Sequence, residues 1–331
     1  MVASFVGTPM NFELLLQYLI IGLANGSLIA LIALGYTIVY GIVELINFAH
    51  GEVFMMGAFF ASSLVTWVGV TNKSAPIAIF GMVGLGLIGA MIFSAVLNYS
   101  IDRMAYKRLR NAPRLAPLIT AIGFSFILQN LGIYWKGSIA FSPPSLIPSQ
   151  YRTYNILNEW FHLDTEVRIR PLDLAVVGLT VPLLILLTAF INRTRAGKAM
   201  RATAQDREAA ALMGIDINRS ISLAFLIGGA LAGAAGFIAL YYNNSARFQM
   251  GFRYGLFAFT AAVLGGIGNL TGAVVGGFLI GIVWSLSDGY MKQFLPGWGA
   301  EWTPAVIFSV LVIMMIFKPG GLFGDHTTEK V

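Results

Sequence analysis

The sequence predicts an all-α protein that crosses a membrane several times, with residues 1–331 forming a single transmembrane domain. The chain is 57% hydrophobic and 11% charged, whereas about one quarter of the residues in a soluble domain are charged. Its apolar residues occur in runs of about 20, the length of a membrane-spanning helix. They lack the alternation that is typical of strands in a membrane β-barrel. These observations together predict a polytopic integral membrane protein.

The apolar runs give about eight to ten membrane segments. Two short runs, residues 35–46 and 255–264, are half-helices interrupted by Gly-rich turns. The first would be roughly 17 Å long, too short alone to cross a hydrocarbon core of about 30 Å. Merging each short run with its neighbour gives eight segments and counting both gives ten, and either count places both termini in the cytoplasm. The other runs are residues 14–34, 53–70, 76–98, 115–135, 172–191, 221–242, 273–286 and 304–317.

The distribution of charge predicts the orientation in the membrane. Residues 102–114 hold five Lys or Arg side chains against one Asp, and residues 193–219 hold six against three acidic side chains. Residues 137–170 hold three charges of each sign. An excess of Lys and Arg marks cytoplasmic loops, so we expect the first two segments inside and the third outside. The formal net charge of +6 therefore indicates orientation, and no binding of nucleic acid is expected.

The basic segment 193–219 also carries a helix signal. Residues 202–213 are rich in good helix formers, and Gly214 stands where a helix would end. We therefore expect one helix over Arg201–Ile215 on the cytoplasmic side. Two interpretations are open: the helix docks a partner protein, or the segment is a solvated basic loop that only sets the topology.

Small residues four positions apart predict faces on which helices approach closely in lipid. The first apolar run has one such face. A second is predicted where the run 273–286 begins. The residues are Gly22, Gly26 and Ala30 on the first face and Gly268, Gly272 and Gly276 on the second.

The turns Asn47–Gly51 and Asn269–Gly272 are similar, and each follows one of the short runs. Their similarity predicts an approximate internal repeat around residues 14–100 and 219–290, although Gly-rich apolar sequence can also resemble itself by chance. Paired short, Gly-interrupted segments in a transporter point to the translocation site. The candidate residues of that path are Asn47, His50, Gly51, Glu52, Gly265, Gly266 and Asn269.

Motifs of several common chemistries are absent from the sequence. It contains no P-loop, no G-x-S-x-G elbow and no H-E-x-x-H metal motif. His50 and Glu52 are either proton-relay residues inside the membrane or a polar turn at the cytoplasmic interface. We expect no metal site and no cofactor. No span carries a row of acidic residues, so the energy for uphill transport would come from a partner.

Five stretches carry a resemblance to a known family. They are ALGYTIVYGIVELINFAHGEVFMMGAF (33–59), PLITAIGFSFILQN (117–130), GKAMRATAQDREAAALMGI (197–215), FTAAVLGGIGNLTGAVVGGFLIG (259–281) and KPGGLFG (318–324). Through them the chain resembles the membrane subunit of branched-chain amino acid ABC importers, the LivH-like permeases, over roughly residues 14–324.

The resemblance implies a role for the basic segment 193–219 and a set of partners. Glu208, Ala209 and Ala210 with Gly214, flanked by Arg201 and Ile215, resemble the loop that couples a permease to a groove of an ATPase subunit. A second permease subunit, LivM-like or identical, would complete the pore in the inner membrane. Two cytoplasmic ATPase subunits and a periplasmic amino-acid-binding protein would complete the importer.

The resemblance also implies a substrate class and leaves alternatives. The substrates would be leucine, isoleucine and valine, and relatives in the family carry other amino acids or urea. The permease would provide a gated path and no ATPase activity of its own. An ion-coupled secondary transporter working alone is a rival interpretation. An intramembrane enzyme is disfavoured by the missing motifs.

Overall fold

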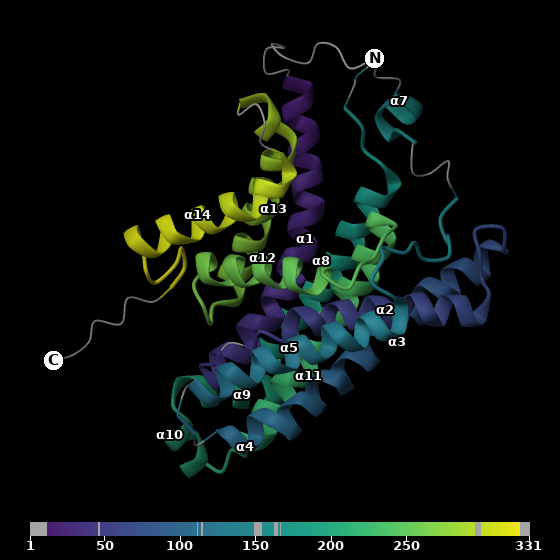
Figure 1. The fold of residues 1–331 in the computed structure, drawn as a ribbon. Coiled ribbons are helices and arrows are strands. Elements are labelled where there is room, and N and C mark those ends of the chain that lie inside the picture. The colour runs from purple at the N-terminus through teal and green to yellow at the C-terminus, as the bar shows by residue number, and fades with distance from the viewer. Residues whose placement is uncertain are drawn as a thin grey trace.

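The computed structural model describes residues 12–45, 47–110, 112–113, 115–148, 154–161, 165, 167–294 and 299–324 (Figure 1). Within these ranges the regular secondary structure is helical, apart from one isolated antiparallel bridge between Phe141 and Ala246. Eight helices among the described residues are long and apolar enough to cross a membrane. The predicted all-α, multi-pass fold is therefore confirmed.

The long helices follow the predicted runs closely. In chain order they are α1 (Phe12–Val43), α2 (His50–Val68), α3 (Pro76–Ile101), α5 (Leu115–Lys136), α8 (Pro171–Arg193), α11 (Ile217–Asn243), α12 (Met250–Gly265), α13 (Leu270–Phe294) and α14 (Thr303–Phe317). Short elements connect them: the π-helix η1 (Asp102–Tyr106), α4 (Lys107–Leu109), α7 (Ile156–Phe161), α9 (Arg195–Gln205), α10 (Arg207–Leu212) and the 3-10 turn η2 (Ala300–Trp302).

Only one of the two predicted short runs is a separate helix. The run 255–264 remains a separate short helix, α12, of 16 residues. The run 35–46 is not a separate half-helix, because α1 continues through it to Val43 as one helix of 32 residues. Apolar residues continue through this part of α1, and the helix ends only where Glu44 adopts a φ of 57°.

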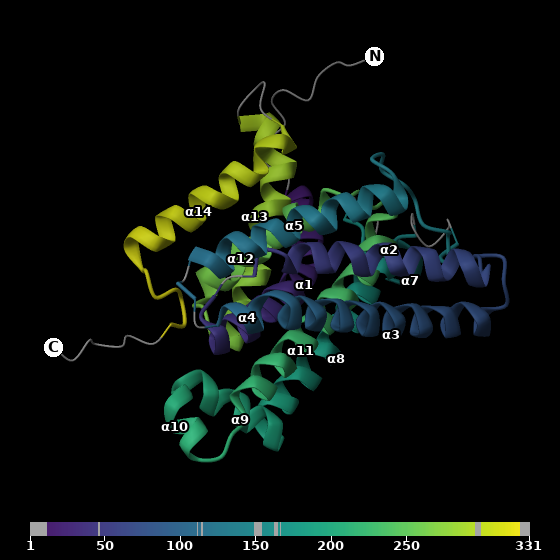
Figure 2. The same ribbon diagram turned by 60° about the horizontal axis from the view of Figure 1, so that its bottom comes forward.

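Two helices, α1 and α11, form the centre of the bundle. Burial covers 89% of the most apolar stretch of α1 and 78% of that of α11, compared with 11% for α14. Figures 1 and 2 show α14 at the edge of the bundle, where it begins beside α13. Apolar side chains exposed on such outer helices are what a bilayer, rather than water, would cover.

Glycines set the distance between the central helices and their neighbours. On α1, a Cβ at Gly26 would lie 2.8 Å from the Cα of Phe278 on α13. On α11, a Cβ at Gly233 would lie 2.2 Å from the carbonyl oxygen of Ala90 on α3. Both distances are shorter than a carbon contact allows, so a larger residue at either place would push two backbones apart. The predicted close packing on the α1 face is confirmed.

The second predicted packing face requires a correction. Gly272 and Gly276 lie in α13, where their Cβ atoms would meet the carbonyl oxygens of Gly265 and Ala261 on α12 at 2.2 and 2.1 Å. Gly268 lies before α13 begins and has a φ of 95°. Nothing lies within 4 Å of where its Cβ would be. The three glycines therefore do not share a helical face, because the helix that would align them starts at Leu270.

The two ends of α1 contact different segments of the chain. Near its start, Glu13 accepts a hydrogen bond from the Thr165 hydroxyl at 3.0 Å, and the Gln17 side chain accepts one from the Arg168 amide at 2.6 Å. At its other end, the Ile42 carbonyl accepts hydrogen bonds from α10. Both counts of membrane segments place the N-terminus in the cytoplasm. The contacts of α1 instead pair its start with the segment 137–170, which is expected outside, and its end with the basic segment 193–219, which is expected inside.

Candidate functional site

The segment α9–α10 projects from one end of the bundle (Figures 1 and 2). The predicted single helix over Arg201–Ile215 is wrong, because the chain breaks at Asp206, whose φ of −155° and ψ of 112° are extended. The Asp206 carboxylate accepts hydrogen bonds from the amides of Glu208 and Ala209, both at 2.9 Å. Asp is a strong N-cap because it satisfies amides that lack helical partners, so a second helix starts there.

The end of α10 agrees with the sequence. Gly214 has a φ of 81°. Its amide donates to the Ala211 carbonyl, and the amide of Ile215 donates to the Ala210 carbonyl, both at 3.0 Å. This pair of bonds is the Schellman motif, in which a left-handed residue satisfies the last carbonyls of a helix. The helix α10 is thus closed at both ends by its own sequence.

The exposed surface of α10 is partly apolar. Leu212 and Met213 are 89% and 84% exposed, and Glu208, Ala209 and Gly214 are also exposed. Burial of large apolar side chains is favourable by about 1.5–3 kcal/mol each, so this exposed pair at the end of a projecting helix is a candidate contact surface for another protein. Sequence reasoning missed Leu212 and Met213, although two large apolar residues at the end of a polar helix were a usable signal.

Three of the predicted coupling residues do not lie on the exposed surface of α10. Ala210 is 4% exposed and faces the body of the protein. Arg201 is exposed, and its guanidinium donates to the Asn192 side chain at the end of α8, at 2.7 Å. Ile215 is half-buried in the turn before α11. The predicted residues therefore divide into an exposed set and a set that holds α9 and α10 to the bundle.

The candidate path residue Asn47 lies in a buried polar network. It is 2% exposed, and its side-chain amide donates to the Asn98 side chain at 3.3 Å. Its oxygen accepts from the Tyr106 hydroxyl at 3.1 Å, and Asn98 donates to the Phe225 carbonyl at 2.7 Å. Buried polar groups that are satisfied in this way fix one arrangement of the elements that carry them. Here they join the α1–α2 turn to α3, η1 and α11.

His50 and Glu52 lie in the first turn of α2. They are 1% and 0% exposed, so they do not form a polar turn at the surface. One oxygen of Glu52 accepts from Gln129 at 2.8 Å and from Ser125 at 3.3 Å, both on α5. The His50 ring packs edge-on against Tyr36 with 4.7 Å between the ring centres.

Gly51, between these two side chains, lies where α2 crosses α12. A Cβ at this position would be 2.3 Å from the Gly251 carbonyl oxygen and 2.9 Å from the Cα of Gly255. The two helices therefore cross with their backbones in contact, which is possible only without side chains at these positions.

The other candidate path residues are held by the C-terminal segment. The amides of Leu322 and Phe323 donate to the carbonyls of Leu264 and Gly265 at 2.8 and 3.0 Å. The Asn269 side chain donates to the Phe323 carbonyl at 3.0 Å. The turn at Gly265 and Gly266, where Gly266 has a φ of 102°, is thus closed by the KPGGLFG stretch.

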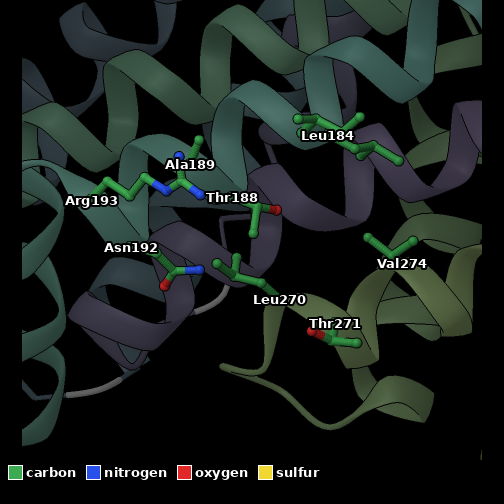
Figure 3. Close-up of a pocket in the computed structure, with 9 residues that line it drawn as sticks. Leu184, Thr188, Ala189, Asn192, Arg193, Leu270, Thr271 and Val274 are labelled. Carbon is green, nitrogen blue, oxygen red and sulfur yellow. The ribbon is translucent and has the colours of Figure 1, made fainter.

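An open groove lies beside this second turn (Figure 3). Its volume is about 490 Å³, and it runs between the last turns of α8 and the first turns of α13. Leu270 and Thr271, which directly follow Asn269, line it together with Asn192 and Arg193. Asn269 therefore sits next to an open groove, whereas Asn47 is enclosed by helices.

A further buried carboxylate was not singled out from the sequence. Asp102, in η1, is 0% exposed; it pairs with Arg110 at 2.8 Å and accepts from the Ser222 hydroxyl at 2.7 Å. Burial of Asp102 requires these partners, because an unpaired buried charge is costly.

Comparison with known proteins identifies the family. A family described as "Branched-chain amino acid transport system / permease component" matches residues 18–315. The chain belongs to this family. It is 36% identical over 321 residues to the high-affinity branched-chain amino acid transport system permease protein LivH of Salmonella typhimurium, covering 97% of this chain and 99% of that protein. It is 38% identical over 317 residues to the corresponding permease BraD of Pseudomonas aeruginosa, covering 96% and 98%.

More distant similarities extend beyond bacteria. A probable branched-chain amino acid transport permease protein LivH of Methanocaldococcus jannaschii is 26% identical, covering 90% of this chain and 89% of that protein. A solved structure, PsaBC from Streptococcus pneumoniae in complex with Fab, covers 94% of this chain and 92% of its own at 16% identity and a TM-score of 0.46. That likeness is too low to add to the family assignment, which rests on the near full-length matches.

Proposed function

We propose that this chain is the permease subunit of an ATP-driven importer that carries branched-chain amino acids delivered by a periplasmic binding protein. Family membership and the names of the near full-length relatives support the substrate class. A second permease subunit, LivM-like or a second copy of this chain, would complete the pore. Two cytoplasmic ATPase subunits would supply the energy, because the sequence holds no P-loop of its own.

The observation that carries the proposal is the exposed surface of α10. Leu212 and Met213 project from the bundle in a segment whose excess of Lys and Arg favours the cytoplasmic side. Apolar side chains exposed to the cytoplasm, and not to lipid, are a surface for a protein partner. With this end of the bundle in the cytoplasm of an inner-membrane protein, α1 begins on the outer side and the segment 318–324 lies inside.

The proposed role of the chain itself is passive. Asn47, His50, Gly51 and Glu52 are candidates for the gate, since they lie where α2 begins and crosses α12. Gly265, Gly266 and Asn269 are candidates at the second turn. Movement of the coupling segment would open the path, and the binding protein would supply selectivity. Urea or other amino acids are alternative substrates within the same class of importer.

A substitution on α10 tests the docking role. Ala209→Trp or Leu212→Asp would block the exposed surface and leave the membrane spans unchanged, so we expect normal protein level with loss of ATPase co-purification and of ATP-driven uptake. Glu159→Trp, on exposed α7 away from α10, is the matched control. Parental uptake and ATPase binding by both α10 variants would support a solvated loop instead.

One specific observation favours a second candidate function, an ion-coupled transporter. Glu52 is a buried carboxylate within a membrane span, and such groups often mark ion pathways. Purified protein in liposomes without ATPase subunits discriminates between the two. Uptake driven by an ion gradient would replace the importer proposal, and no uptake until ATPase subunits, ATP and binding protein are added would support it.

The orientation has its own test. The chain has no cysteine, so single cysteines can be labelled without background. Lys198→Cys on α9 should be protected from an impermeant thiol reagent in intact cells, and Asn158→Cys on α7 should be labelled. Labelling of Lys198→Cys from outside would invert the proposed orientation.

A further inference from the structure

The first residue of α10 connects the coupling segment to the centre of the bundle. The Nε and one terminal nitrogen of Arg207 both donate to the carbonyl oxygen of Ile42, at 3.1 and 2.6 Å. Ile42 is 4% exposed and lies in the last turn of α1. Carbonyls in a last turn lack helical amide partners and carry partial negative charge, which a cation stabilises. Arg207 therefore binds the end of α1 from outside that helix.

The Ile42 carbonyl, which Arg207 contacts, is close in sequence to Gly51, where α2 crosses α12. Two residues after Ile42, Glu44 has a φ of 57°, a left-handed conformation that a non-glycine residue adopts only at a steric cost. Asn47, with its buried network, follows three residues later. Gly51 then contacts Gly251 on α12. A short segment, fixed at both ends, thus joins the Arg207 contact to the α2–α12 crossing.

The other end of α10 carries the docking surface. Leu212 is the last residue of the short helix that Arg207 begins, and Met213 is its C-cap residue. Asp206 caps the start of this helix and Gly214 closes its end. A helix closed at both ends moves as a unit. A displacement imposed on Leu212 and Met213 is therefore carried to the Arg207 side chain.

We propose that Arg207 is a positioning residue that transmits movement of α10 to the turn between α1 and α2, and through that turn to the α2–α12 crossing. This inference rests on the proposed function, since it needs an ATPase to move α10. Charge-assisted hydrogen bonds are about twice as strong as neutral ones, which suits a contact that has to hold while its two sides move. The docking surface binds the ATPase, and Arg207 connects it to the path.

The test separates docking from transmission. Arg207→Met keeps the length and apolar stem of the side chain and removes its donors. Complexes of this variant with the ATPase subunits and binding protein are reconstituted in liposomes. ATPase binding, ATP hydrolysis and amino acid uptake are then measured. Lys198→Met removes an exposed cation of α9 and is the matched control. Arg207→Lys keeps the cation but loses the planar pair of donors.

The expected result is a change in coupling and not in assembly. Arg207→Met should bind ATPase and hydrolyse ATP as the parent does, while uptake per ATP hydrolysed falls about tenfold, the factor that corresponds to a loss of ~1.4 kcal/mol. Arg207→Lys should recover part of the ratio, and Lys198→Met should keep it. A purely structural role would lower protein level, binding and hydrolysis together, and would leave the ratio unchanged.

Each contrary result is distinct. A parental ratio in Arg207→Met overturns the transmission role. Loss of ATPase binding in that variant assigns Arg207 to docking and overturns it as well. If Arg207→Met does not accumulate in the membrane, Arg207→Lys decides, and a parental ratio in it counts against the proposal. If the parent chain binds no ATPase, the proposed function fails, and the role of Arg207 fails with it.

Discussion

The turn that follows α1 and the turn that follows α11 share two backbone features but have different side-chain surroundings. Glu44 and Asn244 stand just after the two helices with φ values of 57° and 52°. The amide of His50 then donates to the Asn47 carbonyl at 3.0 Å. In the other turn the amide of Met250 donates to the Arg247 carbonyl at 2.9 Å. Each turn therefore begins with a left-handed residue, and a backbone hydrogen bond of the same spacing leads into the next helix.

The difference lies in what encloses the turns. Asn47 is 2% exposed within its network, whereas Arg247 is exposed. Arg207 of the coupling segment also donates to the Ile42 carbonyl in α1, just before the first of these turns. Just before the turn that leads into α12, the Asn243 side chain at the end of α11 donates to the Tyr254 hydroxyl at 2.9 Å. The comparison teaches that similar turns can be tied to the rest of the protein in different ways: polar side chains hold the turn before α2, whereas a backbone bridge between Ala246 and Phe141 holds the turn before α12.

The predicted internal repeat stays a prediction, and this comparison supports a different alignment within it. The turn at Asn47 precedes α2 and the turn at Arg247 precedes α12, and the helices meet at Gly51 and Gly251. Helix α1 packs on α13, and α11 packs on α3. Asn269, which sequence similarity had paired with Asn47, instead follows α12. This alignment predicts that residues 14–100 and 219–290 run in opposite directions through the membrane, as inverted repeats do.

A side chain added at the α2–α12 crossing would disturb the turns before both helices at once. We expect the largest effect on folded protein there. Gly51→Val would place carbon atoms against the Gly251 backbone, whose oxygen lies 2.3 Å from the new Cβ position. Overpacking of a core costs about 1–3 kcal/mol and more where backbones collide. We expect little folded protein in detergent, measured by fluorescence-detected size exclusion after heating.

The control for this prediction is a glycine without close neighbours. Gly81 is exposed on α3, and nothing lies within 4 Å of where its Cβ would be. Gly81→Val should give a folded yield and a thermal midpoint close to those of the parent. Equal yields of Gly51→Val and Gly81→Val would show that the α2–α12 crossing is not close-packed.

Much of this fold was predictable from the sequence. Apolar runs locate the spans because a bilayer requires about 20 apolar residues per helix. The small residues Gly22, Gly26 and Ala30 predicted the contact of α1 because close approach in lipid needs them. The end of α10 at Gly214 was predictable because a left-handed residue there has a local cause.

The rest depended on contacts between distant residues. Nothing local to residues 35–43 shows that they continue α1, since a short apolar run fits a half-helix equally well. The break at Asp206 was locally visible as an N-cap residue, but strong helix formers on both sides outweighed it in the interpretation. The burial of Asn47, His50 and Glu52 could not be predicted, because it is produced by α3, α5 and α11, which are far away in the sequence.

The second prediction compares the buried polar network of the turn between α1 and α2 with an exposed side chain of the turn between α11 and α12. Asn98→Leu would leave the Asn47 amide and the Phe225 carbonyl without the partners they have now. An unsatisfied buried group costs about 1–3 kcal/mol. Arg247→Ala changes an exposed side chain, and such changes stay within about 0.5 kcal/mol. We expect Asn98→Leu to lower the thermal midpoint clearly and Arg247→Ala to leave it unchanged. A similar shift in both variants would remove the distinction between the turns.

The smallest effect concerns the two left-handed residues themselves. Glycine adopts this conformation without the steric cost that Glu44 bears, about 1–2 kcal/mol, but it loses about 0.4–1 kcal/mol through the greater freedom of the unfolded chain. Asn tolerates the left-handed region better than Glu does, and Asn244 makes polar interactions of its own. Glu44→Gly should therefore raise the thermal midpoint slightly, and Asn244→Gly should leave it equal or lower. The two variants are measured side by side in the same detergent, with Glu44→Ala as the control that removes the carboxylate without relieving the backbone. If Glu44→Ala raises the midpoint as much as Glu44→Gly does, the carboxylate and not the backbone conformation was the source of the cost.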